Sequence, residues 1–161
     1  MNVMKQLLLT GAGFIILNLV SCENNSAEQN WYKGNLHTHS LWSDGDDFPE
    51  MIIQWYKDND YQFIALSDHN TIGDSEFWYE IKERERKHKT LEKYQNRFGD
   101  WVETKTDSGK TLVRLKTFEE YQSKLQLPDS FLVIKSEEVT SSFNNKPVHI
   151  NVTNIKKKID P

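Results

Sequence analysis

The feature that most constrains the fold is an apolar run at 63–66 that passes through one serine into Asp68 and His69. A short, continuous apolar run is typical of a strand buried in a parallel sheet. Upstream, 31–36 has the pattern of a short strand, and Pro49 suits the first turn of a helix. Strand, helix and strand in this order make a βαβ unit, so the sequence predicts an α/β fold.

Three helices are expected. The one that Pro49 opens is expected to be capped by Asp46 or Asp47. A highly charged segment, 76–98, is a second helix candidate, and Thr117 with Glu120 forms a capping box that opens a third.

Further strands are expected along the rest of the chain. Alternating segments at 101–106 and 110–115 flank Asp-Ser-Gly, which predicts a hairpin. A second apolar run at 131–134 again indicates a buried strand, and 148–152 is expected to form a final strand.

The N-terminus has the pattern of an export signal. Lys5 precedes an apolar stretch at 7–20, which is shorter than the ~20 residues of a membrane span. The stretch ends in Leu-Val-Ser-Cys, which resembles a bacterial lipobox with Cys22 as the lipidated residue. We expect 1–21 to be a lipoprotein signal peptide and 22–30 a flexible tether, so that the chain is anchored in the bacterial cell envelope; the alternative is a plain signal peptide with an incidental Cys.

Composition fits one soluble globular domain after the tether, at 31–161. Of the 161 residues 37% are hydrophobic and 27% charged, and aromatic residues supply core material. The net charge of −4 gives no reason to expect nucleic acid as a partner. The single Cys excludes a disulfide within the chain and a zinc–thiolate site.

Residues that bind metals gather at the predicted strand ends, where α/β folds assemble their sites. His37 and His39 are two apart, so on an extended strand they point the same way. Asp44 lies in a Ser-Asp-Gly turn, in which Gly45 lets the backbone curl, and His69 follows the strand at 63–66. The other members of this set are His149 and one of Glu137 or Glu138, whereas His88, in the charged segment, is interpreted as solvated.

Order and spacing of these residues resemble a known family. His-Thr-His-Ser-Leu-Trp-Ser-Asp-Gly at 37–45 resembles the first motif of the polymerase and histidinol phosphatase (PHP) superfamily, His-x-His-x-x-x-Ser-Asp-Gly. The apolar strand and Asp-His at 64–69 resemble its second motif. The strand with Glu-Val at 135–140 and the strand with His at 148–151 are similar to later ones.

This resemblance implies the N-terminal part of a distorted (β/α)7 barrel that holds two or three divalent ions of Mn, Zn or Fe. Glu138 is preferred to Glu137, which would face the other side of its strand, because Glu138 directly precedes a Val as in the family. Asp68 is expected to act in catalysis by orienting a ligand, not by binding metal itself. The implied metal ligands are His37, His39, Asp44, His69, Glu138 and His149.

Two departures from the family pattern stand out. A further His and an Asp-x-His, which complete the family's metal shell, have no counterpart after His149, so we expect a C-terminally truncated chain that is nearly inactive alone. The long gap between the second and third motifs indicates an insertion at about 75–127, made of helical and hairpin segments.

The resulting hypothesis is a metal-dependent hydrolase, a phosphoesterase, that cleaves a small-molecule phosphate ester with a metal-activated water. The first alternative is hydrolysis of another bond, an amide or a different ester, by the same metal chemistry. The second is a lipid-anchored metal-binding protein without turnover.

Overall fold

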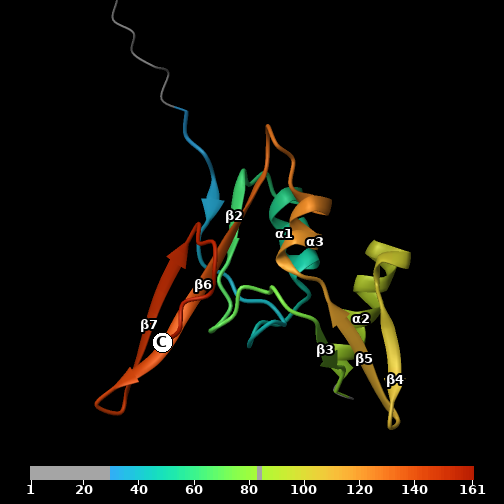
Figure 1. The fold of residues 1–161 in the computed structure, drawn as a ribbon. Helices are drawn as coiled ribbons and strands as arrows, with labels where there is room; N and C mark the ends of the chain where they lie inside the picture. The colour runs from blue at the N-terminus through green and yellow to red at the C-terminus, as the bar shows by residue number, and fades with distance from the viewer. Residues whose placement is uncertain (1–29, 83–84) are drawn as a thin grey trace, which may run out of the picture. The chain divides into compact units, whose positions relative to one another are not determined.

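Two β-sheets and three α-helices make up the described part of this computed structural model, which is residues 30–82 and 85–161 (Figure 1). The strands are β1 (Gly34–Asn35), β2 (Phe63–Leu66), β3 (Phe77–Glu80), β4 (Thr104–Asp107), β5 (Lys110–Leu115), β6 (Leu132–Phe143) and β7 (Lys146–Thr153). The helices are α1 (Pro49–Asp58), α2 (Glu85–Phe98) and α3 (Phe118–Leu125), with a short 3-10 turn at Gly99–Trp101.

The expected signal peptide, the lipidated Cys22 and nearly all of the tether lie outside the described residues. Within 30–82 and 85–161, no helix combines the length and the apolar character that crossing a bilayer requires.

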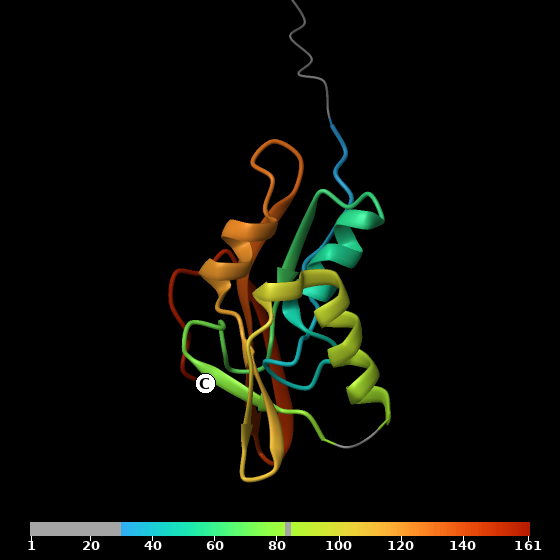
Figure 2. The ribbon, with the colours of Figure 1, turned by 90° about the vertical axis from the view of Figure 1, so that its right-hand side faces the viewer.

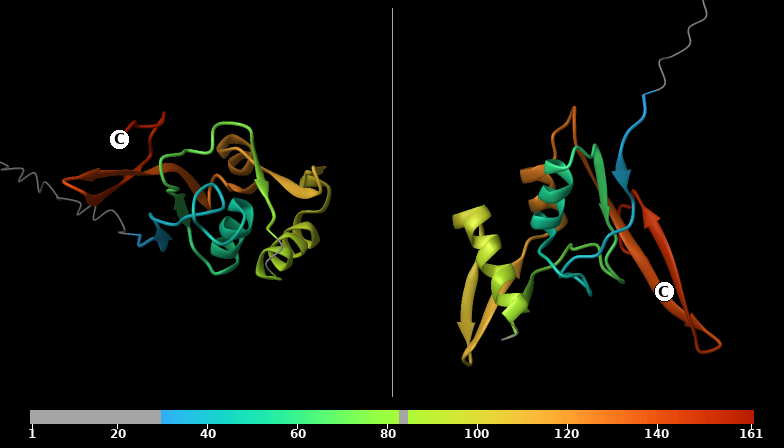
Figure 3. Two further views of the ribbon diagram at one scale, coloured as in Figure 1. Left: turned by 90° about the horizontal axis from the view of Figure 1, so that it is seen from below. Right: turned by 180° about the vertical axis from the view of Figure 1, so that it is seen from behind.

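The larger sheet has the strand order β1-β2-β6-β7. Its first three strands are parallel, with Ile64 of β2 opposite Val133 of β6, so the predicted βαβ unit is confirmed. β7 instead runs antiparallel to β6, and the two continue as a hairpin beyond the parallel part of the sheet (Figure 3). In the described residues, β1 and β7 are the edge strands of this sheet. The (β/α)7 barrel therefore stays a prediction.

Helix α1 begins at Pro49 as predicted, but its cap differs from the expected one. The residue before it is Phe48, which makes no side-chain capping bond, so neither Asp46 nor Asp47 is the cap. Phe48 is completely buried and stacks on Tyr94 of α2, with ring centroids 4.1 Å apart. Tertiary packing therefore sets the start of this helix. The Asp47 carboxylate instead accepts a hydrogen bond from the Phe48 N–H and pairs with Lys93 of α2.

The helix expected at 76–98 is wrong in its first part. β3 (Phe77–Glu80) occupies that part and pairs antiparallel with β5, with Trp78 opposite Arg114. The reason is the run Phe-Trp-Tyr at 77–79, because aromatic side chains favour a pleated surface over a helix. The charged helix begins at Glu85, and the side chain of His88 lies outside the described part.

The predicted hairpin of β4 and β5 is confirmed, and it completes the smaller sheet, whose order is β3-β5-β4. Ser108 and Gly109 both have positive φ, of 50° and 78°, as in the turns that join two strands tightly. β4 starts at Thr104, later than expected, because the 3-10 turn precedes it.

Two apolar clusters hold these elements together. The first lies between α1 and α3, which sit side by side, and strands β2 and β6; Ile53, Ile64 and Tyr121 belong to it. The second joins the loop after β1, through Leu41, to α2 and β5 (Figure 2). Segment 75–127 thus contributes to both clusters, and the capping box that opens α3 is confirmed. Its origin as an insertion stays a prediction.

Glu50 is a carboxyl group buried completely beside the second cluster. Its Oε1 accepts hydrogen bonds from the Tyr94 hydroxyl, at 2.7 Å, and from the Trp101 indole, at 2.9 Å. Its Oε2 is buried without a hydrogen-bond partner. Burial raises the pKa of this carboxyl above its ordinary value, and the two hydrogen bonds oppose the rise only in part.

Glu50→Gln is therefore expected to stabilise the chain at alkaline pH. A raised pKa means that the folded chain holds this proton more tightly than the unfolded chain. The stability that the protonated Glu50 carboxyl contributes is complete below its pKa in the unfolded chain. It is lost as the pH rises through its pKa in the folded chain. The neutral amide keeps the Oε1 acceptor, so at pH 8 the variant should melt roughly 3–6 °C higher, the shift that ~1 kcal/mol gives. At pH 5, thermal unfolding of the wild type and the variant should give melting temperatures that lie closer together. A difference in melting temperature that does not change with pH would contradict this expectation.

Candidate metal centre

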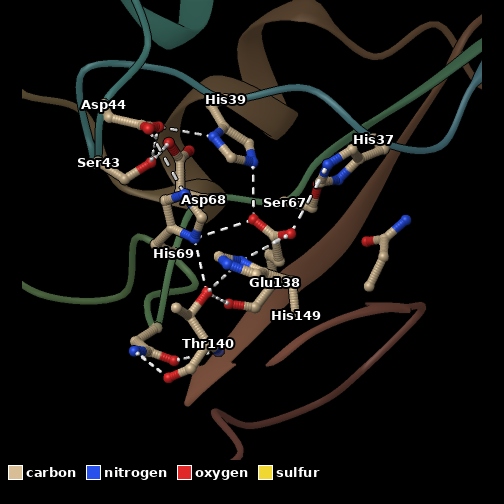
Figure 4. A network of polar contacts seen from close by, with 12 residues as sticks. His37, His39, Ser43, Asp44, Ser67, Asp68, His69, Glu138, Thr140 and His149 are labelled. Atoms are coloured by element: carbon tan, nitrogen blue, oxygen red, sulfur yellow. Dashed lines mark hydrogen bonds and ion pairs between the residues drawn. The ribbon is translucent and has the colours of Figure 1, made fainter. Parts of the chain in front are cut away.

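Six residues predicted as metal ligands lie together at one end of the parallel strands (Figure 4). His37 and His39 follow β1, Asp44 lies in the next loop, and His69 follows β2. The other two come from the hairpin of β6 and β7. They form three overlapping groups, each with ligand atoms within 4.8 Å of one another: His37, His39 and Glu138; His39, Asp44 and His69; His69, Glu138 and His149.

Glu138 is the residue that the four imidazoles share. Its Oε2 lies 2.9 Å from Nδ1 of His69 and 3.1 Å from Nε2 of His39. Its Oε1 lies 3.3 Å from Nδ1 of His149 and 3.9 Å from Nε2 of His37. Since the residue is only 7% exposed, its carboxylate projects into the centre and not into solvent.

Asp44 closes the other side of the centre. Its Oδ1 lies 2.6 Å from Nδ1 of His39, and its Oδ2 lies 3.5 Å from Nε2 of His69. The hydrogen bond from His39 holds the pKa of the Asp44 carboxyl below its ordinary value, so this group is ionised at neutral pH.

Asp68 lies outside the three groups and holds the loop that carries Asp44. The Asp68 carboxylate accepts hydrogen bonds from the N–H and the hydroxyl of Ser40, both at 2.7 Å, and from the hydroxyl of Ser43, at 2.6 Å. It is nearly buried, and these bonds fix the turn between His39 and Asp44. The expected role of Asp68 in orienting a ligand stays a prediction.

Gly45 is required in that turn because two backbone segments approach closely. A Cβ added to Gly45 would lie 2.6 Å from the carbonyl carbon and oxygen of His39 and from Cα of Ser40. The N–H of Gly45 donates to the Ser40 carbonyl at 2.9 Å. Lack of space, not a positive φ, therefore explains this glycine.

Glu137 points away from the centre, on the opposite face of β6 from Glu138. It is completely buried, and its Oε2 accepts a hydrogen bond from the Ile159 N–H at 2.9 Å. Of the two adjacent glutamates, the structure brings only Glu138 to the histidines.

The strand expected at 131–134 is longer than predicted, so Glu138 lies within a strand, as His149 was expected to. β6 does not stop near 134 but continues to Phe143. Asn144 and Asn145 then form a tight turn with φ of 48° and 58°, and β7 returns antiparallel. The pairing of Thr140 with His149 brings this last histidine to the centre.

Polar residues that the sequence did not single out hold the imidazole rings. Thr140 Oγ1 lies 2.6 Å from Nδ1 of His69 and 3.3 Å from Nδ1 of His149. The backbone of Thr140 is in turn bound on both sides by the side-chain amide of Asn70, which accepts from its N–H at 2.8 Å and donates to its carbonyl at 2.9 Å. Ser67 contacts His37 in a similar way. The only sequence signal for these residues is that they neighbour the motifs.

The residues present fit divalent metal ions. Imidazole nitrogens and carboxylate oxygens suit Zn, Mn and Fe. His39 Nε2 and Glu138 Oε2 are buried and lie 3.1 Å apart, yet within the described residues neither forms a hydrogen bond, which buried polar atoms normally do. A shared cation would satisfy both atoms.

One side of the centre is open to solvent. The side chains of His37, Asp44 and His149 are 48%, 67% and 41% exposed. A groove of about 720 Å³ between α1 and α2 contains none of the six ligands and belongs to another part of the surface. Comparisons of the chain with protein-family models, curated proteins and solved structures find no match.

Proposed function

We propose that this chain is a metal-dependent phosphoesterase of the PHP type, exported and anchored to a membrane by a lipid. The observation that carries the proposal is the convergence of four histidines and two carboxylates, from four separate segments of the chain, around the buried carboxylate of Glu138. Such a set has the ligand types of a centre for two or three divalent ions.

The carboxylates would have different roles in holding these ions. Glu138 reaches all four histidines and would supply a carboxylate ligand in the two groups that contain it. Asp44 supplies a second negative charge at the exposed side, and Asp68 keeps its loop in place. Together the two ligand carboxylates offset part of the charge that divalent ions bring into a nearly buried position.

Bound divalent ions supply Lewis acidity: they lower the pKa of a water to near neutrality and stabilise the charge of an in-line displacement at phosphorus. With that chemistry, a protein nucleophile is not needed. Ser67, which lies beside His37, is completely buried and already bonded to that ring, so it is not placed to attack a substrate. The exposed faces of Asp44 and His149 mark the side from which a phosphate ester would approach.

Phosphate release is the test. The full-length protein is purified, stripped with a chelator, reloaded with Mn, Zn or Fe, and assayed on simple phosphomonoesters and diesters. We expect release that requires added metal. Hydrolysis of amide or carboxylic ester substrates instead would favour the other hydrolase, and tight metal binding without turnover would favour the binding protein.

The membrane anchor has its own test, because it depends on Cys22 alone. Wild-type chain expressed in bacteria with a radioactive fatty acid should become labelled, and Cys22→Ser should not. Equal labelling of both chains would refute the anchor without affecting the phosphoesterase proposal.

A further inference from the structure

Ser67 places its hydroxyl beside the His37 ring, and two bonds fix it there. Its Oγ lies 2.8 Å from Nδ1 of the His37 ring. Its backbone N–H donates to the carbonyl of Thr38 at 2.9 Å. Ser67 is completely buried and follows β2 directly, so its hydroxyl is held in a fixed position beside the more exposed His37.

The His37 ring needs a fixed bonding partner, because packing alone does not set its orientation. The side chain is 48% exposed, and β1, which precedes it, is only two residues long. Its ring meets that of His39 edge-on, with centroids 5.0 Å apart, a contact that leaves rotation open. The hydroxyl of Ser67 supplies the directional bond that selects one orientation.

The bond also bears on the tautomer, because the Ser67 hydroxyl can accept from an Nδ1–H or donate to an Nδ1 lone pair. A neutral imidazole has one N–H and one lone pair. If Nδ1 donates its hydrogen to Ser67 Oγ, the lone pair lies on Nε2, the atom that faces Glu138 at 3.9 Å. Nε2 is then the ligand atom in the group of His37, His39 and Glu138. Partners that bond the second nitrogen of a ligating histidine in this way typically affect metal affinity 10–100-fold.

We infer that Ser67 is the positioning residue for His37, holding the Nδ1–H tautomer so that Nε2 can bind the ion of that one group. The inference rests on the proposed function, because it concerns one ligand of the proposed centre. It is specific to one group: His69 and His149 depend on Thr140 and not on Ser67.

Two measurements on Ser67→Ala test it, with Ser136→Ala as the matched control. Ser136 is also buried and lies on the neighbouring strand β6, where its hydroxyl donates to the carbonyl of Ile134 in the same strand. In the first measurement, nitrogen-15 NMR of the metal-free chain reports the tautomer of each histidine ring. We expect Nδ1–H for His37 in the wild type and in Ser136→Ala, and a shift toward Nε2–H in Ser67→Ala.

The second measurement is a titration with Co²⁺, followed by its visible absorption. Ser67→Ala should weaken one binding step roughly 10–100-fold and leave the others unchanged, whereas Ser136→Ala should match the wild type. Ser67→Thr, which keeps the hydroxyl, should restore the lost step. An Nε2–H tautomer in the wild type, or equal effects of the two alanine variants, would overturn the inference. If the wild type binds no Co²⁺, the proposed function fails, but the tautomer still decides the role of Ser67.

Discussion

Glu138→Gln should cost the chain most of its divalent metal, with affinity falling ~100-fold or more. The expected loss exceeds the 10–100-fold typical of residues behind the ligands, because Glu138 itself meets the imidazoles of all four histidines. Glutamine has nearly the same size but lacks the charge, and its amide hydrogens would point at nitrogen atoms that must accept a cation. The metal content of dialysed protein, measured by elemental analysis, gives the result directly.

Glu137→Gln is the matched control for this change. Glu137 is the preceding residue of the same strand and equally buried, but it faces away from the histidines and bonds to Ile159. It should bind as much metal as the wild type. Metal-free melting curves of both variants would show whether either change disturbs folding. Equal metal content in the two variants would mean that Glu138 is not a ligand.

Gly45→Ala should weaken metal binding at the proposed group that contains Asp44 and destabilise the fold. The added methyl group would lie 2.6 Å from backbone atoms of His39 and Ser40, a separation at which backbone must move. Forcing an extra carbon into packed structure typically costs about 1–3 kcal/mol. Because Asp44 directly precedes Gly45 and contacts His39 at 2.6 Å, that movement separates the two ligands.

A second glycine distinguishes crowding from conformational strain. Gly99 has a positive φ of 51°, yet a Cβ added there would meet no atom within 4 Å. Gly99→Ala should therefore lower stability by about 1 kcal/mol without loss of metal. Co²⁺ titration and thermal unfolding of both variants make the comparison. If Gly45→Ala binds Co²⁺ like the wild type, the turn does not set the ligand geometry.

The grouping of the ligands could be predicted from the sequence because local signals and topology agree. His37 and His69 each follow a strand, and parallel neighbouring strands place such residues at one edge of the sheet. The choice of Glu138 over Glu137 came from the family pattern, and alternation along β6 gives the same choice.

What the sequence did not reveal depends on tertiary partners. The length of β6 is set by its pairing with β7. The cue in the sequence was the Asn pair at 144–145, because Asn tolerates the positive φ that a tight hairpin turn requires. The cap of α1 depends on Phe48 stacking with Tyr94, far along the chain. The holding role of Thr140 needs the register of two strands, which no local pattern supplies.

The position of His149 on β7, the last strand of the larger sheet, has a thermodynamic consequence. Edge strands open locally at a lower free energy than central strands. An ion bound by His69, Glu138 and His149 would have to be released, or lose a ligand, before this hairpin could separate from the sheet. Metal occupancy and the hydrogen-exchange protection of the β7 amides would then be linked. Slower exchange of these amides would indicate that the proposed metal centre is occupied.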